Sequence, residues 1–171
     1  ALGSDQVAAL TTTQLASLSS AAVKGLATED VATFDSADLA SLNSRSLAAL
    51  STDNVAALTS AQLTALSGIQ IGALTTAQVA VLDSDQIDGL STSQVAALTS
   101  SQVIALGTDN VASLSTEQVA ALSSRAVAAL TTAQLEAMST DQIQALSSAQ
   151  IAALTSSDLA ALSSADLGTF S

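Results

Sequence analysis

Few side chains in this 171-residue sequence could do chemistry. The sequence contains no His, Cys, Tyr or Trp. The remaining candidates for a catalytic base or nucleophile are Lys24, the 15 carboxylates and the many Ser and Thr hydroxyls. A Ser–Lys pair or two carboxylates could catalyse a reaction if the fold brought them together. Ser and Thr, however, recur at fixed positions whether or not a charged residue is near. We therefore predict no catalytic residue, no cofactor and no enzymatic activity.

The acids Asp83, Asp85 and Asp88 alternate in the manner of a calcium-binding loop. A complete loop of that kind also needs a glycine turn and a distal Glu, and both are missing here. Asp83 and Asp85 also coincide with a predicted helix start, where acids are favoured without any ligand. The same interpretation applies to Glu29-Asp30 beside Asp35. We predict no metal site, although the sequence leaves weak calcium binding near Asp83 open.

These residues are embedded in a repeat of eight residues, an octad, that covers the whole sequence. Every eighth residue from Leu2 is Leu, with Phe34, Met138 and Phe170 as the exceptions, and every eighth residue from Val7 is Val, Leu or Ile. Two apolar columns therefore run from one end of the sequence to the other. Such fixed self-similarity is typical of repeat architectures.

Each octad carries the signals of a helix start. The position of Ser115 holds Ser, Thr, Asp, Asn or Gly in every octad except at Ala27, and these residues cap helix N-termini. Gln118 follows three residues later, which makes a capping box, and Leu114 with Val119 has the spacing of a hydrophobic staple. A helix start every eight residues leaves about seven residues, roughly two turns, for each helix.

Helices this short are marginal alone, so they must pack on their neighbours. We therefore predict an all-α solenoid, with one two-turn helix per octad. The column of Ala121 holds small residues except at Val81, and small side chains would let neighbouring backbones approach closely. The column of Thr116 is Ser or Thr except at Gly68, and we expect its hydroxyls to bond the backbone of the next repeat in a ladder. The variable columns of Glu117 and Ala120 are expected to face solvent.

Two other folds compete with this prediction. In one continuous helix the apolar stripe would rotate by about 80° per octad and smear around the cylinder. A β-solenoid remains an alternative, because eight residues resemble one short strand and a turn. Against it, the Val and Leu columns have odd spacings, which would place them on opposite faces of a strand. An ice-binding face is disfavoured because Ser and Thr are freely mixed within their column.

Composition limits the partners. A net charge of −12 repels phosphate backbones and anionic lipids, so we expect no nucleic-acid binding. No apolar run approaches the ~18 residues of a membrane span, and no signal peptide is visible, so we expect no membrane insertion. We predict one repeat domain over residues 1–171, about 21 octads long and part of a longer array. The octad pattern continues into both termini without polar capping repeats, so we also expect end-to-end or lateral self-association.

The run Leu-Thr-Thr-Ala-Gln-Val-Ala-Val-Leu at Leu74–Leu82, with a related run at Leu130–Leu135, resembles the octad arrays of very large bacterial surface or type I secreted, adhesin-like proteins. The resemblance covers the whole sequence and implies an extracellular, non-enzymatic stalk, spacer or filament-forming segment. It implies no binding residues.

A second hypothesis is an adhesin module that binds a surface protein or glycan through the variable columns. We rank it lower, because aromatic side chains usually anchor such interfaces. The only aromatic residues are Phe34 and Phe170, and both belong to the predicted core column.

Overall fold

The computed structural model describes residues 3–162 and contains only α-helices within that range. The all-α prediction is confirmed, and no strand of the alternative β-solenoid is found in this range. The twenty helices are α1 (Ser4–Ala8), α2 (Thr12–Ala16), α3 (Ser20–Val23), α4 (Thr28–Val31), α5 (Ser36–Ser41), α6 (Ser44–Leu47), α7 (Thr52–Ala56), α8 (Ser60–Thr64), α9 (Gly68–Gly72), α10 (Thr76–Val79), α11 (Ser84–Asp88), α12 (Thr92–Ala96), α13 (Ser100–Ala105), α14 (Gly107–Ser113), α15 (Thr116–Ala121), α16 (Ser124–Val127), α17 (Thr132–Ala137), α18 (Thr140–Gln144), α19 (Ser148–Ile151) and α20 (Ser156–Ala161).

Each octad forms one helix, as predicted, but the helices are only four to seven residues long. The reason is that both ends of an octad are extended. Ser115 precedes α15 with φ −68° and ψ 162°, and Leu122 ends it with φ −58° and ψ 142°. The Ser115 hydroxyl accepts from the Gln118 backbone N–H at 3.2 Å, so the predicted cap forms. The extended residues make the corner at which the chain turns into the next helix.

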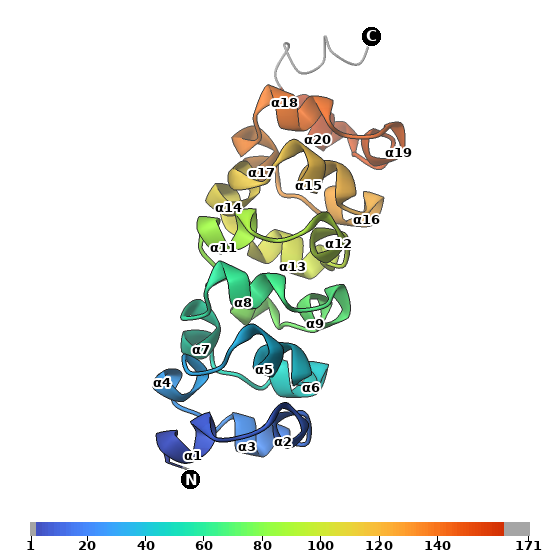
Figure 1. Cartoon of the computed structure of the whole chain (residues 1–171). Coiled ribbons are helices and arrows are strands. Elements are labelled where there is room, and N and C mark those ends of the chain that lie inside the picture. The colour runs from blue at the N-terminus through green and yellow to red at the C-terminus, as the bar shows by residue number, and fades with distance from the viewer. Residues whose placement is uncertain (1–2, 163–171) are drawn as a thin grey trace.

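The octads are stacked in a rising superhelix (Figure 1). Helices pack on those three octads away along the chain: α12, for example, contacts α9 and α15. One superhelical turn therefore takes about three octads, a period that the sequence pattern did not reveal. Stacking of this kind explains how such short helices persist, because each is held by the turns below and above it.

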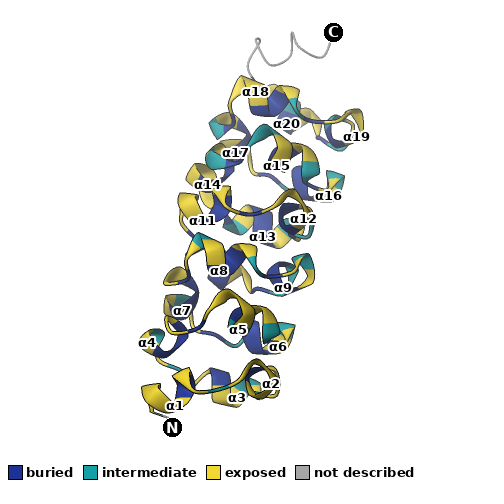
Figure 2. Ribbon diagram, in the orientation of Figure 1, coloured by how far each residue is buried: buried dark blue, intermediate teal, exposed yellow. Residues whose placement is uncertain are grey.

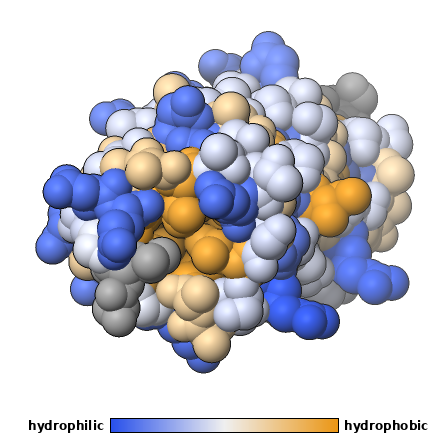
Figure 3. Space-filling view, turned by 60° about the horizontal axis from the view of Figure 1, so that its bottom comes forward, coloured by the Kyte–Doolittle hydropathy of each residue, from blue (hydrophilic) through white to orange (hydrophobic). Residues whose placement is uncertain are grey.

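The two apolar columns line the interior along the whole rod (Figure 2). Val95 and Leu98 are 0% and 4% exposed, and Phe34 fills a leucine place at 3%. Phe170 lies outside the described residues. Figure 3 views the end near α1, where apolar surface is ringed by polar residues. Leu10, Leu18 and Leu26 in the first turn are only partly buried.

The stack also twists slightly about its axis. In Figure 1, α1, α4, α7, α11, α14 and α17 lie along one edge, whereas α6, α9, α12, α16 and α19 lie along the opposite edge. Along each edge the step is three octads, with one step of four. Because of the one step of four, the helices along an edge belong to one series of every third octad near the N-terminal end and to another series near the C-terminal end.

Two glycines allow an especially close contact between turns. A Cβ on Gly72 would lie 2.9 Å from the Ala97 carbonyl oxygen, and one on Gly68 would lie 3.0 Å from the Ser93 carbonyl oxygen. Helices α9 and α12 can approach this closely only because both positions lack a side chain. None of the described helices is both long enough and apolar enough to span a bilayer.

Candidate functional site: a side-chain ladder between superhelical turns

The side-chain amide of Gln102 joins two superhelical turns. Its Oε1 accepts from the Thr99 backbone N–H at 2.8 Å and from the Thr99 hydroxyl at 2.9 Å, which completes the capping box of α13. Its Nε2 donates to the Leu74 carbonyl at 2.8 Å and to the Ile71 carbonyl at 3.0 Å in the turn below. Both amide hydrogens and both lone pairs of this buried group are thus satisfied.

The same contact recurs in most octads of the array and forms a ladder. Each side chain bonds the carbonyl of the Leu or Phe that lies 28 residues earlier, directly before the cap of the octad below. The contacts are Ser46 to Leu18, Asn54 to Leu26, Gln62 to Phe34, Gln70 to Leu42, Gln78 to Leu50, Gln86 to Leu58, Gln94 to Leu66, Gln102 to Leu74, Asn110 to Leu82, Gln118 to Leu90, Gln142 to Leu114 and Gln150 to Leu122.

Sequence reasoning assigned this column only to capping and missed its second role. A signal was present: the column contains no Glu in any octad. Glu serves a capping box as well as Gln does. An amide can also donate to a carbonyl from the same position, whereas an ionised carboxylate cannot. The exclusion of Glu therefore indicates a second acceptor facing the column.

The predicted Ser/Thr ladder is present only in part, and its partner differs from the prediction. Ser60 and Ser100 donate to the carbonyls of Asp85 and Arg125 at 2.9 and 3.0 Å, 25 residues ahead, in the next superhelical turn rather than the next octad. Several hydroxyls of this column, such as those of Thr76 and Thr92, are exposed. The prediction that these hydroxyls bond the backbone of the next repeat was wrong, because octads stack on those three octads away and the bonded hydroxyls reach that turn.

Carboxylates replace the amide in a few octads. Asp158 is 9% exposed, and its Oδ2 accepts from the Thr155 N–H at 2.7 Å, so the cap is kept without a donor for the turn below. Asp30, 5% exposed, accepts from the Ala27 N–H at 2.9 Å in the same way. The nearby Ser4 hydroxyl first, and next this N–H, hold the pKa of Asp30 below its ordinary value of 3.8.

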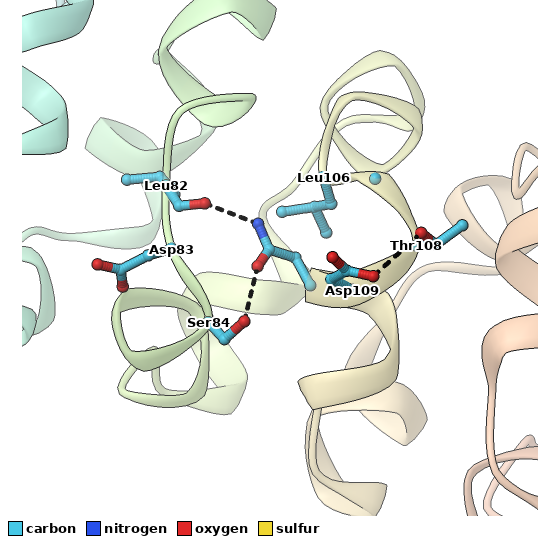
Figure 4. Close-up of a pocket in the computed structure, with 8 residues that line it drawn as sticks. Leu82, Asp83, Ser84, Leu106, Thr108 and Asp109 are labelled. Carbon is cyan, nitrogen blue, oxygen red and sulfur yellow. Dashed lines mark hydrogen bonds between the residues drawn. The ribbon is translucent and has the colours of Figure 1, made fainter.

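The ladder is irregular at Gly107, which has φ +77°. Leu106 is helical here instead of extended, so Gln134 donates to Val103 at 2.9 Å and to Gly107 at 3.4 Å rather than to Leu106. A cavity of about 400 Å³ opens at this corner (Figure 4), lined by Leu82, Asp83, Ser84, Leu106, Gly107, Thr108, Asp109 and Asn110.

The acids considered as calcium ligands do not converge there. Asp83 caps α11 by accepting from the Gln86 N–H at 2.8 Å, while Asp85 and Asp88 are exposed. In Figure 4 the carboxylates of Asp83 and Asp109 lie on opposite sides of the cavity. Within residues 3–162 no group of three or more potential ligands could hold a metal ion. Asp35, near Glu29-Asp30, likewise caps α5 through the Asp38 N–H at 2.8 Å.

The outer surface carries the two variable columns, as predicted. Lys24, Arg45, Glu117 and most other members of these columns are exposed. Ile69, at 81% exposure, is the most prominent apolar side chain outside the core.

Comparison with known proteins supports the repeat architecture. The family model described as the ALTTAQ repeat matches four successive segments, residues 31–68, 69–100, 100–132 and 126–156. No curated protein matches the chain. The matched segments together cover well over half of the sequence and coincide with the octads that carry the amide ladder. The chain therefore belongs to the ALTTAQ repeat family.

Proposed function

We propose that this array is a structural spacer or stalk, a non-enzymatic segment of an exported bacterial surface protein. The observation that supports the proposal best is the ladder of buried amides, which bonds each superhelical turn to the one below. Because each octad repeats the same contacts with its neighbouring turns, the length of the rod grows with the number of octads. An array of this kind sets a distance, which is what a stalk requires.

The length relation can be tested by deleting residues 91–114, which form three octads. Each remaining octad still meets a partner three octads away, so the shortened chain should fold. Small-angle X-ray scattering should then show a maximum dimension reduced by about one-seventh, as expected for an additive repeat array. Duplicating the same residues should lengthen the particle equally. A maximum dimension that does not change in either variant would contradict the spacer function.

The location at the cell surface follows from the sequence resemblance and needs its own test. Antibodies against the array should label intact source cells, and external protease should remove that labelling. Labelling only after the cells are made permeable would contradict export. It would not contradict the spacer role, which the scattering experiment tests separately.

A second candidate function is the binding of a surface protein or glycan by the exposed columns. The cavity at Gly107 favours it, because hydroxyl, amide and carboxylate groups line one concave site. A glycan array probed with the purified chain, with Asp109→Ala as the comparison, should show saturable binding that this substitution weakens. Binding that Asp109→Ala does not affect would exclude this cavity as the site.

A further inference from the structure

Charged side chains are unevenly distributed between the two edges of the rod. The edge formed by α1, α4, α7, α11 and α14 in Figure 1 carries Asp5, Glu29, Asp53, Asp85 and Asp109, each in the first turn of its helix. All five are exposed. We call this set the acidic edge.

The opposite edge carries charges of the other sign. Helices α6, α9 and α16 lie along it in Figure 1, and they present Arg45, Ile69 and Arg125. All three are exposed, and these are the only two arginines in the sequence. We call this set the arginine edge. In the sequence Ile69 lies between the two arginines.

The spacing of the charges matches between the edges. Arg45 and Arg125 are 80 residues apart, and so are Glu29 and Asp109. In a regular array equal numbers of octads give equal rises along the axis. A second copy placed side by side and parallel, displaced by two octads along the axis, would therefore bring Arg45 opposite Glu29 and Arg125 opposite Asp109 at once.

We propose that the arginine edge docks on the acidic edge of a second copy of this chain. The net charge of −12 opposes contact at long range. At about 0.1 M salt such repulsion is screened beyond ~10 Å, so the close approach of opposite charges favours association. The contact is heterologous, since a docked pair keeps one free acidic edge on one copy and one free arginine edge on the other. Such contacts propagate and produce open lateral arrays. The inference concerns self-association and does not depend on where the protein is located.

Sedimentation velocity on the 171-residue chain tests this docking. At about 0.1 M salt the mean mass should rise with concentration, and at about 1 M salt, where the Debye length is ~3 Å, the chain should return to a monomer. The double variant Arg45→Glu/Arg125→Glu should lose self-association, with a dissociation constant raised at least about tenfold. Lys24→Glu changes the cation that directly follows α3 and is not part of the arginine edge, so this variant should associate as the unmodified chain does.

A charge exchange makes the test specific for the paired edges. Glu29→Arg/Asp109→Arg should also be monomeric. An equimolar mixture of the two double variants should associate again, because each edge of one variant then meets an edge of opposite charge on the other. Circular dichroism should confirm that all variants fold, as expected for exposed positions. An unmodified chain that stays monomeric at about 0.1 M salt, arginine variants that still associate, or a mixture that forms no complex would each overturn the proposal.

Discussion

The side chain of Gln102 donates to the carbonyl of Leu74 at 2.8 Å, across one superhelical turn, while it completes the capping box of its own helix. A single residue type thus starts each helix and attaches it to the turn below. The relation explains why buried glutamines line a protein whose core is otherwise aliphatic, because every polar atom of such an amide is satisfied.

The first prediction separates capping from the ladder. Gln102→Glu keeps the capping acceptor but places a carboxylate against the carbonyls of Leu74 and Ile71, so it should destabilise the fold by about 3 kcal/mol or more. Gln14 caps α2 at 2.8 Å from Thr11 but is exposed in the first turn, so Gln14→Glu should change stability by less than ~0.5 kcal/mol. Urea unfolding measures both. Equal losses of stability in Gln102→Glu and Gln14→Glu would show that the ladder does not stabilise the fold.

The second prediction concerns the ladder position occupied by Asp158. Asn54 and Asn110 reach the carbonyl 28 residues earlier at 3.3 and 2.8 Å, so an Asn at Asp158 should reach Leu130. Asp158→Asn should therefore stabilise the fold by about 0.5–1.5 kcal/mol. Asp53→Asn, at an exposed position, is the matched control and should be neutral. A loss of stability in thermal unfolding of Asp158→Asn would contradict the shared geometry.

The third prediction tests the close approach of α9 to α12. A methyl group on Gly72 would press on the Ala97 carbonyl oxygen at 2.9 Å, so Gly72→Ala should destabilise the fold by about 1–3 kcal/mol despite the better helix propensity of Ala. At Gly25 the nearest atom would lie at an ordinary 3.4 Å. Gly25→Ala should therefore stabilise by about 0.4–1 kcal/mol, because it reduces the entropy of the unfolded chain. The same sign in denaturant unfolding of both variants would contradict this explanation.

The fourth prediction is a pH dependence of stability. The folded pKa of Asp30 is lowered, first by the nearby Ser4 hydroxyl and then by the hydrogen bond from the Ala27 N–H. The unfolded chain therefore binds a proton at Asp30 more readily than the folded chain does. The stabilisation of the fold by the ionised Asp30 carboxylate is present above pH 3.8 and is lost as the pH falls through the lower folded pKa. Asp30→Asn should flatten the fall in thermal midpoint between about pH 5 and pH 2.

Glu117 contributes to the same acid dependence. Its own backbone N–H first, and then the hydroxyls of Ser115 and Thr116, lower the pKa of its carboxyl. Glu117→Gln should therefore also reduce the loss of stability below about pH 4.5, the ordinary value for Glu. Glu136, which is exposed and lies late in α17 rather than in a first turn, provides a comparison with Glu136→Gln. If Asp30→Asn and Glu117→Gln both keep the full acid dependence, these two carboxyls do not contribute to it.

The sequence alone determined where each helix begins and which apolar residues are buried. Ser115, Gln118 and the staple of Leu114 with Val119 act within a few residues of one another, and so their pattern can be read without the fold. The number of octads in a turn depends on the angle at each extended corner, which sums small backbone rotations that no residue type specifies. The second hydrogen bond of Gln102 and the sorting of Arg45 and Glu29 onto opposite edges depend on that angle. Only the tertiary structure decided them, because it brings together groups that lie 28 residues apart.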